Sequence, residues 1–241
     1  MIAVILAAGM ARRLRPLTDH CPKCLLEVGG RTLLGRTVDA IHAAGISRIV
    51  IVTGYRADMI RSYIARHYPG GDFSFVDNPD YGTTNNIYSL WLARQHADGR
   101  EFLLLDSDIL LDPRLVERVA ATSVTSLAVN AHELGDEEMK VITDASGHVV
   151  EISKTCSTAR AMGESVGVEH IMPQYSTELY RELEAMTQGE GLCDVFYELA
   201  FERLIPRGLT FLAIDTTDLM SMELDTPDDF RAANDMAAAR A

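Results

Sequence analysis

Positive charge is concentrated immediately after the first apolar run of the chain. The stretch MIAVILAAGMARRLRPLTDHCPK places Arg12, Arg13, Arg15 and Lys23 within the fourteen residues that follow Gly9. Arginine can hold a phosphate through two parallel hydrogen bonds, and several cations suit the several charges of a triphosphate. A glycine there allows close approach of a nucleotide, and the amides of the next loop can face phosphates. The segment therefore indicates a triphosphate site, with a solvated basic loop as the alternative.

Acidic side chains form two pairs far apart in the sequence. Asp106 and Asp108 follow the apolar run EFLLL, and Glu223 and Asp225 lie near the end of another extended segment. Residues i and i+2 of a strand point to the same side, so each pair should direct two carboxylates one way. Mg²⁺ prefers oxygen ligands, usually one or two carboxylates with phosphate oxygens and water. We expect both pairs to converge on one magnesium site, with solvated turns or helix caps as the alternative.

The four cysteines suggest no metal centre. Cys21 and Cys24 form a CxxC, whereas Cys156 and Cys193 are isolated. A zinc site needs about four ligands, and there is no second CxxC. A redox pair is conceivable because CxxC lowers a thiol pKa. We expect instead two small side chains flanking Pro22 and Lys23 in a reducing compartment.

Alternating strands and helices are expected to position these groups. The first half predicts strands at Ile2–Leu6, Arg48–Thr53, Asp72–Asp77 and Glu101–Leu105, and helices at Leu33–Ala44, Asp58–His67 and Asn85–His96. This order predicts an α/β fold: a mostly parallel, doubly wound, Rossmann-like sheet with helices on both faces. Such sheets bind ligands at the carboxyl ends of their strands, where the basic loop and the first acidic pair fall.

The second half predicts a mixed sheet. Its expected strands are Ser126–Asn130, Met139–Ile142, His148–Ile152, Val166–Met172 and Leu209–Ile214, and its expected helices are Ser176–Met186, Asp194–Leu204 and Pro227–Ala239, the last capped by Thr226. We expect one domain over residues 1–241, with a nucleotide-binding half at 1–120 and an acceptor-binding half at 121–241.

Charge and hydropathy exclude several classes of function. The formal net charge of −13 argues against binding to nucleic acid. No apolar run approaches the roughly 18–20 residues that span a bilayer, so no membrane contact is expected. The apolar start has no basic stretch before it, unlike a signal peptide, and we expect a cytoplasmic protein. A homodimer is left open.

The quoted motifs resemble a known family. LAAGMARRLRPLT followed by PKCLLEVGGRTLL is similar to the signature LAAGxGxRLxPLT…PKxLLxVxGxPLL of nucleotidyltransferases that activate sugar phosphates and small phosphate alcohols. Ala11 stands where many members have a second glycine. Neither a GxGxxG nor a Walker A loop is present. The later segment Asn78–Trp91 resembles the phosphocholine and phosphonate cytidylyltransferases.

The resemblance covers most of the chain and implies roles for individual residues. It assigns catalysis to Arg13, Lys23 and Lys154, with Lys154 on the acceptor anion, and the metal to Asp108 and Asp225, with Asp106 and Glu223 as weaker assignments. It assigns the nucleotide to Leu6, Ala7, Ala8, Gly9, Met10, Ala11, Arg12, Asn78, Thr84, Asn85 and Ser107. It assigns the acceptor to Asn86, Ser89, Glu164, Ser165 and Asp194. Thr84 as a plain helix cap is the alternative for that residue.

The acceptor is the least determined part of this interpretation. Choline is a quaternary ammonium and would want an aromatic cage. Choline-type relatives carry a tryptophan shortly before the last acidic pair, where this chain has Ser221 and Met222. We therefore favour a small anionic or hydroxylated phosphonate over phosphocholine.

The predicted function is Mg²⁺-dependent transfer of CMP from CTP to a small phosphonate or phosphocholine-like phosphate. Pyrophosphate is the second product. Three alternatives remain: a sugar-1-phosphate nucleotidyltransferase using UTP or dTTP, a non-catalytic nucleotide-sensing module, and a thiol redox protein using Cys21 and Cys24.

Overall fold

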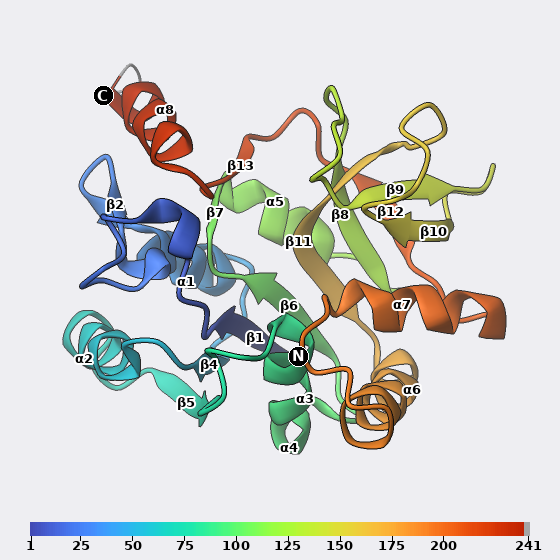
Figure 1. Cartoon of the computed structure of the whole chain (residues 1–241), viewed down its shortest axis with the longest axis horizontal. Helices are drawn as coiled ribbons and strands as arrows, with labels where there is room; N and C mark the ends of the chain where they lie inside the picture. Colours follow the sequence, from blue (N-terminus) through green and yellow to red (C-terminus); the bar gives the residue numbers. More distant parts are fainter. Residues whose placement is uncertain (239–241) are drawn as a thin grey trace.

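Four parallel strands form one half of the sheet in the computed structural model, which describes residues 1–238 (Figure 1). They are β1 (Ile2–Ala7), β4 (Arg48–Thr53), β5 (Asp72–Asp77) and β6 (Phe102–Asp106), in the spatial order β6-β1-β4-β5. Every residue of β1 is buried, as expected for a strand covered on both faces. The strand order reverses between β1 and β6, which creates a crevice at their carboxyl ends.

Helices cover both faces of this sheet. Ala3 and Ile5 of β1 pack toward α1 (Leu33–Ala43), α2 (Ala57–His67) and α5 (Pro113–Ala120). Val4 and Leu6 pack toward α3 (Asn86–Leu92), α6 (Pro173–Glu184) and α7 (Glu198–Leu204). The alternation along β1 follows from the two-residue period of a strand. The predicted doubly wound architecture is confirmed.

The second half extends the same sheet with antiparallel strands. β11 (Gly163–Ile171) pairs with β6 and also with β8 (Ser126–Asn130) and β9 (Lys140–Thr143). β10 (Val149–Ser153) completes the edge beside β9, and β12 (Leu212–Asp215) runs parallel to β8. The expected mixed sheet is therefore present, continuous with the parallel half.

A separate two-stranded ladder, which was not predicted from the sequence, joins the two acidic segments. β7 (Ile109–Leu111) pairs antiparallel with β13 (Ser221–Glu223), with Ile109 opposite Glu223. The helix after β7, α5, was also missed, although Asp112 caps it and Pro113 begins it. Two shorter strands, β2 (Glu27–Val28) and β3 (Arg31–Thr32), form a hairpin before α1.

Two predicted helices are shorter than expected. The helix predicted over Asn85–His96 is interrupted at Ala93, whose amide donates to Leu90, and α4 (Arg94–Ala97) follows. The helix predicted from Asp194 begins only at Glu198. There the backbone contacts the start of α3 instead: Asn85 N donates to Cys193 O at 2.8 Å, and Tyr197 N donates to Asn86 Oδ1 at 2.9 Å.

The last helix, α8 (Pro227–Ala238), begins as predicted. Asp229 N donates to Thr226 Oγ1 at 3.2 Å, and Thr226 N donates to Asp229 Oδ2 at 2.7 Å, which is a reciprocal cap. Ala239, the predicted end of this helix, lies outside the described residues. Within residues 1–238, no helix is long and apolar enough to cross a membrane.

Candidate active site

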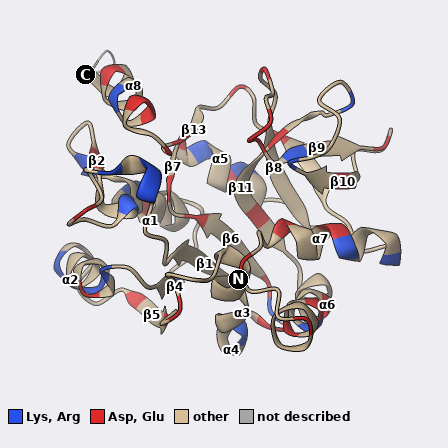
Figure 2. Cartoon of the chain, in the orientation of Figure 1, with Lys and Arg blue, Asp and Glu red and all other residues tan. Residues whose placement is uncertain are grey.

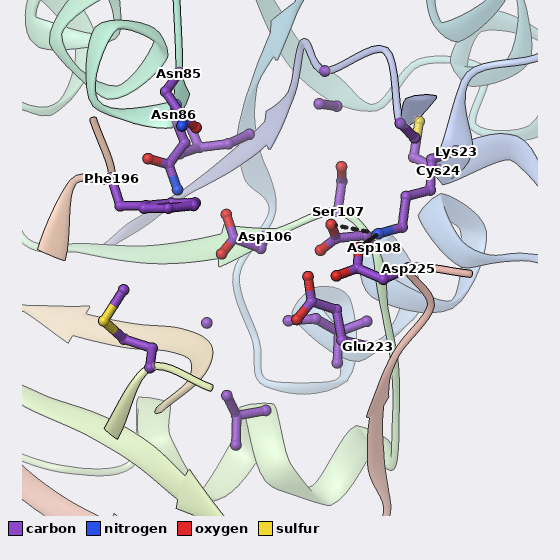
Figure 3. Close-up of a pocket in the computed structure, with 18 of the residues that line it drawn as sticks. Lys23, Cys24, Asn85, Asn86, Asp106, Ser107, Asp108, Phe196, Glu223 and Asp225 are labelled. Carbon is purple, nitrogen blue, oxygen red and sulfur yellow. Dashed lines mark hydrogen bonds and ion pairs between the residues drawn. The ribbon is translucent and has the colours of Figure 1, made fainter. Parts of the chain in front are cut away.

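A cavity of 720 Å³ opens where β1 and β6 end, at the crevice that the strand order predicts (Figure 3). Leu6 of β1 lies opposite Asp106 of β6 in the parallel register, so the loops after both strands reach it. All residues predicted to act in catalysis, metal binding, nucleotide binding or acceptor binding line this cavity except two, Met10 and Asp194. The structure thus brings segments 6–23, 78–89, 106–108, 154–165 and 223–225 together.

The basic loop is held in place by buried contacts behind it. Leu14 is fully buried, and Thr18 Oγ1 donates to Ala11 O at 2.9 Å. Tyr55 Oη in turn donates to Thr18 O at 2.8 Å. Ala11 adopts a left-handed backbone conformation, with φ 45° and ψ 55°. Glycine adopts this conformation at little cost, which gives a physical reason for the glycine that related motifs carry at this position. The advantage of glycine here is its backbone conformation rather than its small size.

Lys23 links the basic loop to both acidic segments. Its buried Nζ donates to Asp108 Oδ2 at 2.9 Å and to Asp225 Oδ1 at 2.7 Å (Figure 3). Arg13 also pairs with Asp225. Burial alone would lower the pKa of Lys23, but the two carboxylates outweigh it and raise that pKa. Burial would likewise raise the pKa of Asp225, but Lys23 and Arg13 hold it below its usual value. Lys23 and Asp225 are therefore both charged at neutral pH.

Three carboxylates form a set that could hold a metal ion. Oxygen atoms of Asp108, Glu223 and Asp225 lie within 4.8 Å of one another. Leu224 N donates to Asp108 O at 3.1 Å, continuing the β7–β13 ladder that brings the acidic segments together. Hard oxygen donors of this kind fit Mg²⁺. Burial, with repulsion from Asp108 and Asp225, raises the pKa of Glu223 to about 8.

Asp106 lies apart from this set, and the i, i+2 argument is wrong for the first pair. The strand β6 ends at Asp106, and Ser107 and Asp108 form a bend before β7, so the two aspartates are not alternate residues of one strand. Asp106 instead accepts a hydrogen bond from Tyr197 Oη at 3.2 Å. Burial, and to a smaller extent the charge of Asp108, raises the pKa of Asp106 well above its usual value.

The Asn78–Ser89 segment forms a compact polar wall. The buried Asn78 Nδ2 donates to Thr84 Oγ1 at 3.0 Å and to Ser89 Oγ at 3.1 Å. Thr84 is not the helix cap: Asn85 takes that place, and its side chain accepts from the amide of Asn86. Because these side chains bond to one another, their orientation toward the cavity is fixed by the fold.

The opposite wall carries residues from the second half of the chain. Lys154 Nζ lies 4.7 Å from the ring centroid of Phe196, and His132 Nε2 contacts Glu164 Oε2 at 2.8 Å. Phe196, Glu198 and His132 line the cavity but were missed. The sequence predicted a helix from Asp194 and did not indicate that residues 194–197 cross the start of α3. This path places Phe196, and not Asp194, in the wall of the cavity.

The cysteines show no sign of redox pairing. None of the four forms a disulfide within the described part of the chain. Cys24 is buried, and burial raises its pKa, which disfavours the reactive thiolate. Its Sγ and that of Cys21 thus flank Lys23 as thiols, in keeping with the expectation of small packing side chains.

Comparison with known proteins identifies the family. Residues 3–203 match the MobA-like NTP transferase domain. The chain belongs to this family. The nucleotidyltransferase resemblance and the enzyme class inferred from the sequence are thereby confirmed.

Individual relatives and structures agree with this assignment. The chain is 29% identical to a CMP-5'-(3-aminopropyl)phosphonate synthase of Streptomyces rubellomurinus over 96% of its own length, and it spans 38% of that relative. It is 27% identical to a 2-aminoethylphosphonate cytidylyltransferase of Lancefieldella rimae, covering 81% of this chain and 77% of the relative. The fold matches that of a CTP:phosphocholine cytidylyltransferase from Streptococcus pneumoniae with a TM-score of 0.83 at 21% identity, over 98% of each chain.

Proposed function

We propose that this nucleotidyltransferase moves CMP from CTP to a small phosphonate or phosphate and releases pyrophosphate. The observation that carries the proposal is the junction of the basic loop and the acidic segments: Arg13 and Lys23 meet Asp108 and Asp225 at one cavity. A triphosphate needs cationic side chains and a divalent cation needs carboxylates, and the two sets must lie next to each other. The choice of CTP is supported by the names of the relatives and by the resemblance of the Asn78–Trp91 segment.

The reaction needs positioning more than proton transfer. An anionic oxygen of the acceptor attacks the α-phosphorus of CTP, the new O–P bond forms, and the bond to the β-phosphate oxygen breaks with its electrons leaving on pyrophosphate. Such an oxygen carries negative charge near neutral pH, so no strong general base is required. Arg13 and Lys23 stabilise the charge that develops on the leaving pyrophosphate, and Lys154 holds the acceptor anion.

The carboxylates supply a metal site that fits Mg²⁺. Asp108 and Asp225 would hold the ion, with Glu223 as the third oxygen donor rather than Asp106. A bound magnesium ion would neutralise phosphate charge and polarise phosphoryl oxygens. Before any such binding, Lys23 shields the aspartates from each other through its contacts of 2.9 and 2.7 Å.

The remaining nucleotide contacts follow from the cavity wall. Leu6–Gly9, Ala11 and Arg12 line one side of the cavity. A Cβ placed on Gly9 would meet no other residue within 4 Å, apart from the chain neighbours of Gly9, so the space beside this glycine is free for a ligand. Thr84, Asn85 and Ser107 provide hydroxyl and amide groups on the neighbouring wall. We assign these groups to the nucleotide, and Asn86, Ser89, Glu164 and Ser165 to the acceptor.

The acceptor wall favours an acceptor with an ammonium tail over an anionic one. Glu198 is nine-tenths buried, and its Oε2 has no hydrogen-bond partner among residues 1–238. A buried carboxylate without a partner is costly, and an ammonium group would pair with it. Among residues 1–238, Phe196 and Tyr81 are the only Phe, Tyr or Trp side chains that line the cavity. Two rings are too few for the aromatic cage that a trimethylammonium group prefers. A primary aminoalkylphosphonate fits best.

Product analysis by ³¹P NMR tests this proposal. Protein, CTP and Mg²⁺ are incubated separately with 2-aminoethylphosphonate, 3-aminopropylphosphonate, a hydroxyalkylphosphonate, a carboxyalkylphosphonate and phosphocholine. The expected result is a phosphonate–phosphate anhydride that forms fastest with the amino compounds. A Glu198→Gln variant should lose that preference while still using the hydroxyalkyl compound. Equal rates with the carboxyalkyl compound would contradict the ammonium assignment.

A further inference from the structure

Lysine is rare in this chain, and each lysine lies in or directly behind the wall of the cavity. Lys and Arg together number 22, and only three of these, Lys23, Lys140 and Lys154, are lysine. Lys23 and Lys154 line the cavity directly. Lys140 does not: only 1% of its surface is exposed, and it lies behind the acceptor wall. A fully buried ammonium without a described role calls for a physical explanation.

The side chain of Lys140 bonds to the backbone of two residues that line the cavity. Its Nζ donates to Lys154 O at 2.6 Å and to Glu138 O at 3.3 Å. No carboxylate within residues 1–238 forms an ion pair with it. The ammonium group of Lys140 thus donates hydrogen bonds to two carbonyl oxygens, one just after β10 and one just before β9.

The strand register places Lys140 where the acceptor wall is assembled. In β9 it lies opposite Ser153 of β10 on one side and opposite Glu164 of β11 on the other. Ser165 N also donates to Met139 O at 2.8 Å beside this pairing. The cavity-lining residues that flank Lys140 through these contacts are Glu138, Met139, Lys154, Glu164 and Ser165. Through its side-chain hydrogen bonds and its place in the strand register, Lys140 therefore links three segments that deliver acceptor contacts.

Packing alone does not account for an ammonium at this position. Transferring an unpaired ammonium from water into the interior costs several kcal/mol, whereas an apolar side chain of similar length would fill the same space at no such cost. Hydrogen bonds from a charged donor are stronger than those between neutral groups, and they fix the accepting carbonyls. The charge of Lys140 is thus best explained by the two backbone carbonyl groups that it holds in place.

We propose that Lys140 is a positioning residue that sets acceptor affinity through Lys154. By holding the carbonyl of Lys154, it fixes the backbone from which that side chain reaches the acceptor anion. It does not touch the acceptor itself. The proposal rests on the proposed function, because it takes Lys154 to be the residue that binds the acceptor phosphonate or phosphate.

A double-mutant cycle tests the proposal. Lys140→Met removes the two hydrogen bonds and the charge but keeps the length of the side chain, and it is compared with Lys154→Met and the double variant. Lys140→Met should raise the KM for the acceptor about tenfold and leave the Kd for CTP unchanged. In the Lys154→Met background the same change should add less than about twofold, because both act through one contact. Arg160→Met, an exposed basic residue beyond β10, is the control and should change neither constant.

Each other outcome has a definite meaning. Independent effects of the two variants, or an unchanged acceptor KM, overturn the proposal. Parallel losses of CTP binding and acceptor binding show a purely structural role and also overturn it. If Lys140→Met does not fold, Lys140→Arg, which keeps a charged donor, replaces it and should retain an acceptor KM closer to wild type than Lys140→Gln. Absence of turnover by the wild-type protein with every acceptor counts against the proposed function itself, before any variant is compared.

Discussion

At the scale of single residues, the site depends on opposite charges held in contact. Lys23 is the clearest case, because its buried ammonium touches carboxylates from two segments that are 117 residues apart in the sequence. The sequence indicated that Lys23, Asp108 and Asp225 lie at the same edge of the sheet. It did not show that the lysine itself bridges the two acids, because the position of a flexible side chain depends on the tertiary fold.

Replacing Lys23 by methionine should lower kcat/KM by about 10² to 10³, because it removes a cation that faces the leaving pyrophosphate. Steady-state kinetics with saturating Mg²⁺ would measure this. Arg15→Met is the matched control: Arg15 pairs with Asp19 and does not line the cavity, so its loss should leave kcat/KM nearly unchanged. Equal losses in the two variants would show that the loop acts only through its total charge.

Replacing Ala11 by glycine should stabilise the protein by about 0.5–1 kcal/mol in urea unfolding. Alanine pays a conformational cost in the left-handed region that glycine does not, and the gain is reduced by the greater freedom of glycine in the unfolded chain. Ala8→Gly is the control, since Ala8 is buried and has no positive φ. It should lower stability. A loss of stability in both variants would refute the conformational argument.

At the scale of elements, the short ladder of β7 and β13 assembles the carboxylate set. The parallel sheet alone brings Asp106 to the cavity, but Asp108, Glu223 and Asp225 meet because Ile109 pairs with Glu223. The sequence predicted that both acidic pairs converge; Asp108, Glu223 and Asp225 do so, whereas Asp106 lies apart. The sequence did not predict the ladder, because three-residue strands have no periodicity that distinguishes them from loops.

The helices near the acceptor wall were harder to predict for a different reason. The segment Asp194–Tyr197 has a composition compatible with a helix, yet its backbone bonds to Asn85 and Asn86 of another element. Such tertiary hydrogen bonds override local preference and are invisible in a single sequence. Elements with strong patterns, such as β1 and β4, were predicted with nearly correct bounds because each contains a continuous run of buried apolar side chains.

Leu224→Ala should weaken metal binding as well as stability. Leu224 is fully buried between Glu223 and Asp225, and its loss should cost about 2–4 kcal/mol and loosen both neighbouring carboxylates. Mn²⁺ binding followed by electron paramagnetic resonance would show a lower affinity. Leu115→Ala, a fully buried position on α5 in a different core cluster, should cost similar stability and leave the affinity intact. Similar Mn²⁺ affinities in the two variants would argue against the ladder as the organiser of the site.

At the scale of the whole molecule, the chain concentrates buried acids around the cavity, and this links its stability to pH. Figure 2 shows acidic segments beside β7 and β13 and along β11, near the middle of the molecule. Burial raises the pKa of Glu198 from 4.5 to about 7. The protonated form is therefore favoured by folding, so this contribution to stability is fully present below pH 4.5 and lost as pH rises to about 7.

Glu198→Gln should flatten this dependence. Between pH 5 and pH 8 the wild type is expected to lose up to about 3 kcal/mol more of its unfolding free energy than the variant, which has no proton to release at this position. Urea unfolding of both proteins across this range measures the difference. Parallel stability curves would show that Glu198 ionises in the folded protein as it does in the unfolded chain.

The central claim is that the cavity transfers CMP from CTP, and pyrophosphate release tests it most directly. The protein is mixed with Mg²⁺, 2-aminoethylphosphonate and, in separate reactions, CTP, UTP, ATP, GTP or dTTP, and pyrophosphate is measured over time. The account predicts release with CTP well above that with the other nucleotides, dependent on the acceptor and abolished by Asp225→Asn. Release only with UTP or dTTP and a sugar 1-phosphate would contradict it, and CTP binding without any release would indicate a nucleotide-sensing protein.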